Sequence, residues 1–135
     1  MKIVCIPAYN EETKIKDVIK KSLPYVDKVV VCDDGSTDDT AVLAKKAGAI
    51  VISHETNQGY GAAIATLFDY CRKNNAEIMV TLDGDGQHNP DQIPDLINVI
   101  LKHKVDVVIG SRSLRDDKDL PSYRKAGIKI ITSTI

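Results

Sequence analysis

The sequence predicts one α/β domain with a Rossmann-like, mostly parallel sheet that is covered by helices on both faces. Short runs rich in β-branched residues alternate with longer segments in which apolar residues recur every three or four positions. The short runs are apolar almost throughout, which is typical of parallel strands that are buried on both faces. Repeated βα units of this kind predict a doubly wound sheet with right-handed crossovers.

The expected strands are the short apolar runs at residues 2–6, 28–32, 49–53, 77–82 and 105–109. Between them, helical spacing places apolar side chains on two clear stripes, one of Ile15, Val18, Ile19 and Leu23 and one of Ile93, Leu96, Ile97, Ile100 and Leu101.

Capping residues mark several of the expected helix ends. Asn89 followed by Pro90 predicts an N-cap and a first-turn proline, and Gly48 predicts the end of the preceding helix. Asn57 is a candidate cap for a helix over residues 62–71. All of these predictions rest on local sequence alone.

The bulk composition is that of a soluble single domain. The chain has 135 residues, 43% of them hydrophobic and 27% charged, with a net charge of −1. This balance gives no general electrostatic attraction to nucleic acid or to an anionic membrane, so we expect no nucleic-acid partner. No apolar run approaches the ~20 residues that span a bilayer. Cys5, Cys32 and Cys71 form no paired motif, which predicts buried free thiols in a reducing, cytoplasmic compartment.

The composition changes after Gly110, where residues 111–129 carry six basic side chains against three aspartates. The last residues, 128–135, stop in the middle of an apolar pattern without a cap. We therefore expect residues 1–135 to be a single domain that is cut short on its C-terminal side.

Polar clusters follow each expected strand, at residues 7–12, 33–39, 57–61, 83–85 and 110–112. In a parallel α/β sheet, ligands bind outside the carboxyl ends of the strands. Because all of these clusters fall at that edge, the sequence predicts a single active-site face there.

Asp83-Gly84-Asp85 is the most informative of these clusters. It directly follows the buried run at residues 77–80, so both carboxylates lie at one strand end. This arrangement suits Mg²⁺ or Mn²⁺, which prefer hard oxygen ligands and often share them with substrate phosphates. A calcium-binding EF-hand loop is excluded, because His88 stands where the turn glycine is required and Pro94 where the last glutamate is required.

Two of the other clusters each allow two interpretations. Asp33-Asp34-Gly35-Ser36 fits either a turn with a helix cap or a carboxylate that accepts a hydrogen bond from a nucleobase imide or a ribose. Residues 57–61 fit either a tight turn or a ligand loop, but not a dinucleotide fingerprint, because Ile64 replaces its third glycine.

The side chains of His88, Arg112 and Arg124 also allow two interpretations each. Among the histidines, only His88 is expected on the active face, in a supporting role rather than as a metal ligand. Arg112 and Arg124 fit solvated surface charges, but their place opposite the carboxylates favours contact with phosphate.

Together these motifs resemble family 2 glycosyltransferases with the GT-A fold, a nucleotide-sugar-binding domain. The motifs that carry the resemblance occur in the family's order and spacing at residues 7–12, 31–38, 57–61, 83–90 and 110–112. Gln87-His88-x-Pro90 and Arg124-Lys125 resemble the polyprenyl-phosphate branch of the family, which includes dolichyl-phosphate mannosyl- and glucosyltransferases.

The resemblance implies a role for each matching residue. Those expected to line the nucleotide site are Pro7, Tyr9, Glu11, Gly59 and Gly61, with Asp34 and Asp33 binding the base. Asp83 would face the ribose or the metal, while Asp85 and Gln87 would ligate Mg²⁺ or Mn²⁺. Arg112 and Arg124 would hold the acceptor phosphate. The catalytic set implied is Asp83, Asp85, Arg112 and Arg124.

The implied reaction is an inverting transfer of a sugar from a GDP- or UDP-sugar to a polyprenyl phosphate. The metal would neutralise charge on the departing diphosphate. A phosphate acceptor has a second pKa of about 6 and needs no separate base at neutral pH. The acceptor lipid also implies peripheral contact with the cytoplasmic face of a membrane. Family members are normally longer, with further acceptor-site motifs downstream.

Two other functions are alternatives to a glycosyltransferase. A sugar-phosphate nucleotidyltransferase needs a glycine-rich, basic loop after its first strand, whereas residues 7–12 are acidic and contain no glycine. A non-catalytic nucleotide-sugar-binding module without an acceptor site is the other alternative, and hydrolysis of the donor without transfer would indicate a competent donor site whose acceptor site is missing.

Overall fold

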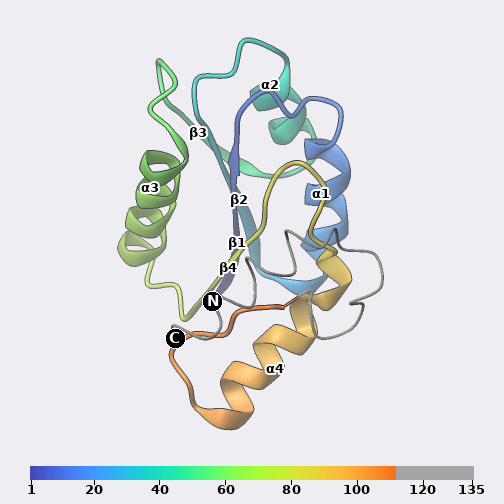
Figure 1. Ribbon diagram of the computed structural model, residues 1–135, viewed down its shortest axis with the longest axis vertical. Helices are drawn as coiled ribbons and strands as arrows, with labels where there is room; N and C mark the ends of the chain where they lie inside the picture. Colours follow the sequence, from blue (N-terminus) through green and yellow to red (C-terminus); the bar gives the residue numbers. More distant parts are fainter. Residues whose placement is uncertain (112–135) are drawn as a thin grey trace, which may run out of the picture. The chain divides into compact units, whose positions relative to one another are not determined.

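The computed structural model describes residues 1–111, and its centre is a four-stranded parallel sheet (Figure 1). The strands are ordered β3-β2-β1-β4, with bounds β1 Lys2–Ala8, β2 Lys28–Asp33, β3 Ile50–Ser53 and β4 Ile78–Thr81. The chain builds outward from β1 on one side through β2 and β3, and then crosses to the other side as β4. The order therefore reverses beside β1, which is the position where ligands bind in open α/β sheets.

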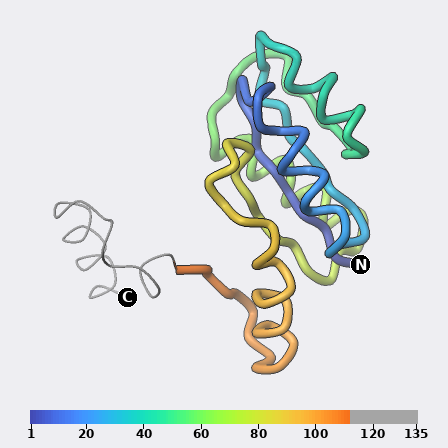
Figure 2. The backbone as a smooth tube through the Cα atoms, turned by 90° about the vertical axis from the view of Figure 1, so that its right-hand side faces the viewer, coloured from blue at the N-terminus to red at the C-terminus, as the bar shows by residue number. Residues whose placement is uncertain are grey.

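The helices lie on both faces of the sheet, as the sequence predicts. The α3 helix covers one face, and α1 and α2 lie on the other (Figure 1). In Figure 2 α1 runs along the strands. The helical segments are α1 Ile15–Ser22, η1 Leu23–Tyr25, α2 Thr40–Lys46, α3 Tyr60–Lys73, η2 Pro90–Gln92 and α4 Ile93–His103. None of the helices in residues 1–111 combines the length and the apolar character needed to cross a bilayer.

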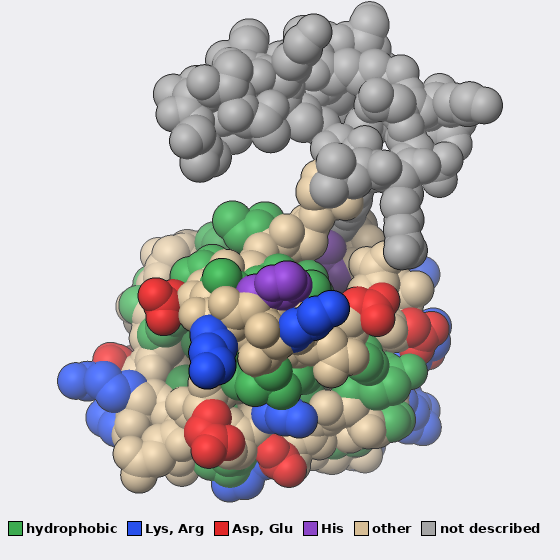
Figure 3. Space-filling model, turned by 90° about the horizontal axis from the view of Figure 1, so that it is seen from below, with side chains coloured by type: hydrophobic (Ala, Val, Ile, Leu, Met, Phe, Trp, Pro, Cys, Tyr) green, Lys and Arg blue, Asp and Glu red, His purple; other side chains and the backbone are tan. Residues whose placement is uncertain are grey.

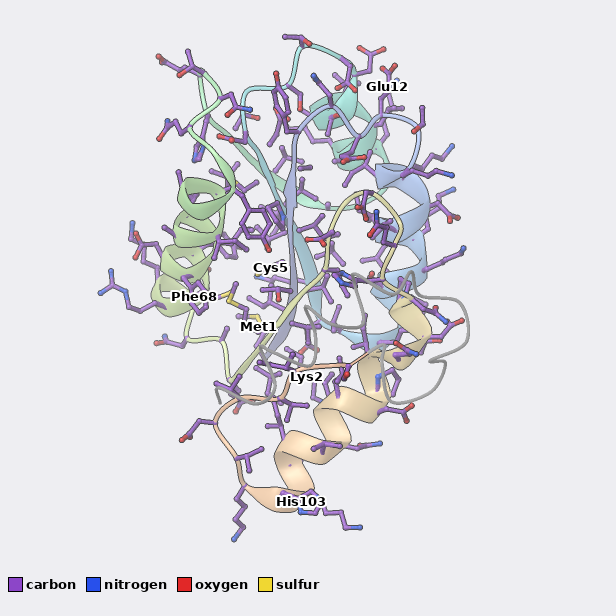
Figure 4. The ribbon with its side chains drawn as sticks, in the orientation of Figure 1. Met1, Lys2, Cys5, Glu12, Phe68 and His103 are labelled. Atoms are coloured by element: carbon purple, nitrogen blue, oxygen red, sulfur yellow. The ribbon has the colours of Figure 1, made fainter. Side chains whose placement is uncertain are left out.

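The strand β1 is buried over nearly its whole length, because it pairs with β2 on one side and with β4 on the other. Its alternate residues Ile3 and Cys5 pack toward α3, in one core cluster with Leu67 and Cys71 (Figure 4). The Sγ atoms of Cys5 and Cys71 lie 3.4 Å apart. All three cysteines are buried and free, which confirms the predicted burial and absence of disulfides.

Two of the predicted helix boundaries are confirmed. The side chain of Asn89 accepts the Asp91 N–H at 3.0 Å, with Pro90 in the first turn of η2. After α2, Gly48 takes a φ of +102°, a conformation that glycine adopts without strain.

The predicted cap at Asn57 is wrong. The α3 helix begins at Tyr60 with Gly59 in the N-cap position, earlier than the apolar pattern indicated. The Asn57 side chain instead accepts the Gly59 N–H at 3.1 Å, a local turn bond that asparagine forms readily.

The predicted strand at residues 105–109 is also wrong. The structure assigns no strand there, and Val107 and Ile109 are 73% and 84% exposed. An apolar run becomes a strand only when a neighbouring edge supplies hydrogen bonds, and within residues 1–111 this run has no ladder partner. The sheet, the pocket described below and its loops all belong to one compact unit, residues 1–98.

Candidate functional site

A pocket of about 460 Å³ opens at the carboxyl ends of β1, β2 and β4. It lies where the strand order reverses, so the sheet topology itself positions it. Figure 3 shows the molecule from below relative to Figure 1, and on that face acidic and basic side chains are interspersed. The pocket is lined by Pro7, Ala8, Tyr9, Glu11, Asp34, Asn57, Gly59, Tyr60, Ala63, Asp83, Gly84 and Asp85.

Most of the predicted site residues meet in this pocket, but several do not. Asp33 is buried outside the lining, and its carboxylate accepts the Ser36 N–H at 3.4 Å. Gly61 lies in the first turn of α3 and is not part of the lining, and Gln87 lines a neighbouring pocket. The predictions for Arg112 and Arg124 lie outside the described residues.

The loops that follow β1 and β2 are bonded to each other, and they hold the pocket wall in place. The Asn10 N–H donates to Ser36 Oγ at 2.9 Å, and the Thr37 N–H returns a bond to Asn10 Oδ1 at 2.9 Å. The Glu11 N–H donates to Thr40 Oγ1 at 2.8 Å. We call this set the inter-loop network; its members are Asn10, Glu11, Glu12, Ser36, Thr37, Asp38, Asp39 and Thr40.

Glu12 and Asp38 complete the network from its two sides. The Glu12 N–H donates to Asp38 Oδ2 at 3.2 Å, and the Asp39 N–H donates to Glu12 Oε2 at 3.1 Å. Figure 4 shows Glu12 where the two loops meet. Asp38 also accepts bonds from the hydroxyl and the N–H of Thr40. Burial alone would raise the pKa of Asp38, but these hydrogen bonds outweigh it and lower that pKa below its usual value.

Asp34 is the most completely bonded carboxylate of the pocket. Its Oδ1 lies 2.7 Å from Nδ1 of His54 and accepts the Gln58 N–H at 2.9 Å, while Oδ2 accepts the Gly59 N–H at 2.8 Å. Burial would raise the pKa of Asp34, yet the bonds from Gln58, His54 and Gly59 lower it overall. Asp34 is therefore held as an anion in the wall of the pocket.

The sequence reasoning missed His54. It follows β3 without a recognisable motif, and no residue beside it indicates a site. Its position directly after a predicted strand, at the same edge as the other polar clusters, was the one available signal.

Gly35 permits a close approach between two of the loops. Its φ is +71°, and a Cβ at this position would lie 2.5 Å from the backbone N of Asn57 and from the carbonyl C of Thr56. Backbone atoms cannot yield as a flexible side chain can, so only glycine fits between these loops.

The metal-binding candidates lie on the other side of the pocket, where negative charge accumulates. Glu11, Asp83 and Asp85 all line it. The pKa of Glu11 is raised, first by burial and then by the nearby charges of Asp85, Asp38 and Asp83. A bound cation would relieve this repulsion.

The residues present fit a Mg²⁺ or Mn²⁺ ion that is completed by substrate oxygens. Within residues 1–111, no group of three or more His, Cys, Asp or Glu side chains is arranged to hold a metal ion on its own. An ion that shares its shell with phosphate groups commonly uses only one or two protein carboxylates. Asp83 and Asp85 supply that number.

The loop at residues 83–90 is held mainly by its own bonds. The Asp83 N–H donates to Nδ1 of His88 at 3.1 Å, and the Gln87 N–H donates to Asp85 Oδ1 at 2.9 Å. Figures 1 and 2 both show the loop arching beside α1. A second pocket of about 230 Å³ is lined by residues of α1 and of this loop, among them Asp17, Lys21 and Gln87. Gln87 thus lines a different pocket from Asp83 and Asp85.

The comparisons with known proteins agree with this geometry. A sequence model of the family described as "Glycosyl transferase family 2" matches residues 3–133. A UDP-N-acetylglucosamine–dolichyl-phosphate N-acetylglucosaminyltransferase of Methanococcus voltae is 34% identical over 142 residues. An undecaprenyl-phosphate 4-deoxy-4-formamido-L-arabinose transferase of Pseudomonas fluorescens is 33% identical over 126 residues. The alignments cover 90% and 84% of this chain, but only 57% and 36% of those proteins.

Solved structures show the same fold. Glucosyl-3-phosphoglycerate synthase of Mycobacterium tuberculosis, in a complex with Mn²⁺, UDP and glucosyl-3-phosphoglycerate, superposes with a TM-score of 0.63 at 34% identity. The match covers 75% of this chain and 39% of that one. The relatives are thus sugar transferases that extend well beyond the length matched by this chain.

Proposed function

Because this chain belongs to glycosyl transferase family 2, we propose that it carries the donor site of a glycosyltransferase that moves a sugar from a nucleoside-diphosphate sugar to a polyprenyl phosphate. One observation carries the proposal: carboxylates from three strand ends converge on one pocket, where the strand order reverses. The named relatives that use dolichyl and undecaprenyl phosphate support this class of acceptor.

The donor would be divided between the two sides of the pocket. The base would lie near Asp34, whose ionised carboxylate can accept the imide N–H of uracil or guanine. Pro7 and Tyr9 would flank the nucleotide, and Asp83 would face the ribose or the metal. The motifs leave UDP-sugar and GDP-sugar donors both open.

Asp83 and Asp85, joined by Gln87, are the residues that would hold Mg²⁺ or Mn²⁺ on the diphosphate. When bound, the cation supplies charge neutralisation for the departing nucleoside diphosphate. Gln87 lines the neighbouring pocket, and its backbone N–H donates to Asp85 Oδ1 at 2.9 Å.

The acceptor would attack the anomeric carbon from the side opposite the diphosphate, which inverts the configuration of that carbon. A phosphate monoester has a second pKa of about 6, so it is already largely ionised at neutral pH and needs no protein base. Arg112 and Arg124 are the residues proposed to hold this phosphate, in contact with a membrane surface.

The test is calorimetric titration of UDP, GDP and their sugar conjugates, with Mn²⁺ and with EDTA. Tight binding of one nucleotide that requires Mn²⁺ is expected, and the absence of binding to any of them would refute the donor site. In a transfer assay, Arg124→Ala should weaken use of polyprenyl phosphate and leave donor binding unchanged. Hydrolysis of the donor without transfer would instead support a donor site that lacks its acceptor side.

A further inference from the structure

His54 connects the candidate base-binding carboxylate to a helix on the far side of the pocket wall. Its backbone N–H donates to the Asp33 carbonyl at 2.9 Å, which continues the pairing of β2 with β3. Its side chain is only 11% exposed. One ring nitrogen meets Asp34, and the other, Nε2, lies 2.9 Å from Thr66 Oγ1 on α3. The ring is therefore fixed at both nitrogens.

The contact with Asp34 determines which ring nitrogen of His54 carries a proton. An ionised carboxylate only accepts, so the proton of this bond lies on Nδ1 of His54. On the other side, Nε2 lies 2.9 Å from the Thr66 hydroxyl, which also donates to the Ala62 carbonyl at 3.1 Å, and 3.6 Å from Sγ of Cys32.

The two carboxylate oxygens of Asp34 accept different numbers of hydrogen bonds. Oδ1 accepts from His54 and from the Gln58 N–H, so both of its lone-pair directions are used. Oδ2 accepts from the Gly59 N–H and keeps an acceptor direction for a ligand. Asp34 lines the pocket, so this remaining direction of Oδ2 is the one that we assign to the donor base.

We propose that His54 is a positioning residue for nucleobase recognition. By holding Oδ1, it fixes the rotation of the Asp34 carboxylate, and Oδ2 then accepts the imide N–H of the base. The inference rests on the proposed donor site and adds a residue that acts through Asp34. A merely structural histidine would affect the stability of the protein without affecting the choice of base.

Two variants separate the functions of the ring nitrogens. In His54→Asn the amide nitrogen can occupy the place of Nδ1 and keep the bond to Asp34. In His54→Gln the longer side chain places its amide nitrogen near the Nε2 position, so the bond to Thr66 is kept and the bond to Asp34 is lost. The two changes are chemically alike, and each serves as the control for the other.

The readout is discrimination against a base that lacks its imide proton. Calorimetry would compare UDP with 3-methyl-UDP and GDP with 1-methyl-GDP, in the presence of Mn²⁺. For the nucleotide that the wild type binds, we expect a preference of about tenfold or more over its methylated form, because methylation leaves the carboxylate unpaired. His54→Asn should keep that preference, whereas His54→Gln should reduce it to within about threefold. Thermal unfolding would confirm that both variants fold.

Each alternative result overturns a defined statement. If His54→Gln discriminates as well as wild type, or if both variants lose discrimination equally, His54 does not position Asp34. If wild type binds nucleotide without preferring the unmethylated base, the inference fails while the donor site stands. If wild type binds no nucleotide, the donor site fails with it. Should His54→Gln not fold, Thr66→Val removes the second anchor of the ring, and an undiminished preference in that variant would equally refute the inference.

Discussion

The two sides of the pocket are built in different ways. On the base side, the loops after β1 and β2 are bonded to each other through the inter-loop network, and Asp34 is bonded to the loop after β3. On the metal side, the loop at residues 83–90 is held largely by bonds within itself. The base side is therefore held by bonds within the protein, whereas the metal side carries mutually repelling carboxylates that a cation would stabilise.

Gly35→Ala should have the largest effect, because it disturbs the base side at its closest contact. The added Cβ would meet backbone atoms at 2.5 Å, and its φ of +71° is unfavourable for alanine. We expect a loss of about 3 kcal/mol or more in the free energy of unfolding, measured by urea denaturation.

Gly61→Ala is the matched control. Gly61 lies in α3 with no atom within 4 Å of the position its Cβ would take, so alanine there should stabilise by about 0.5–1 kcal/mol. Equal effects at the two glycines would show that the contact between the loops is not a constraint.

Asp85→Ala should have the next largest effect, on binding rather than on folding. Removing one carboxylate from the metal side should weaken Mn²⁺-dependent nucleotide binding roughly 100-fold. The free energy of unfolding should stay within about 0.5 kcal/mol of wild type, since the loop loses only the bond from Gln87. Glu55→Ala, which removes an exposed acid from the loop after β3, should change neither quantity. Unchanged nucleotide affinity in Asp85→Ala would contradict the metal role.

Asp38→Asn should weaken the inter-loop network by about 1 kcal/mol at pH 7. Because folding lowers the pKa of Asp38, its ionised form contributes stability above the pKa of the unfolded chain. That contribution is lost as the pH falls through the lower pKa of the folded state. The stability difference from wild type should therefore shrink below about pH 4. Asp39→Asn, at an exposed neighbour whose side chain caps no helix, is the matched control and should leave the free energy of unfolding at pH 7 within about 0.5 kcal/mol of wild type.

Glu11→Gln should have the smallest effect and the opposite sign. The pKa of Glu11 is raised, so its charged form is disfavoured in the folded protein, and a neutral side chain should stabilise the metal-free protein by less than about 1 kcal/mol. Thermal unfolding with EDTA would measure the gain, and Mn²⁺ with nucleotide should reduce or reverse it. A destabilised metal-free variant would mean that the carboxylates do not repel one another.

The sequence was sufficient for the features that depend on local patterns. The four observed strands and the turn at Asn89 follow from short apolar runs and from capping chemistry. Asp34, Asp83 and Asp85 could be placed together because the carboxyl ends of parallel strands share one edge. What escaped prediction depends on long-range contacts. No local motif distinguishes His54 from a surface residue, and its partner Asp34 is 20 positions away.

The predicted strand at residues 105–109 failed for the same reason. Its apolar pattern is real, but a strand also needs a neighbouring edge, which no local pattern reports.

The inter-loop network also limits how this sequence can vary. In three of its bonds, the main-chain N–H groups of residues 10–12 donate to side-chain oxygens of Ser36, Thr40 and Asp38. Every amino acid but proline supplies an N–H, so substitutions at position 11 would keep the bond to Thr40, whereas positions 10 and 12 also accept bonds through the side chains of Asn10 and Glu12. Proline at position 10, 11 or 12 would remove one of these N–H bonds. A library of variants selected for folding should therefore exclude proline at positions 10, 11 and 12 and be most permissive at position 11.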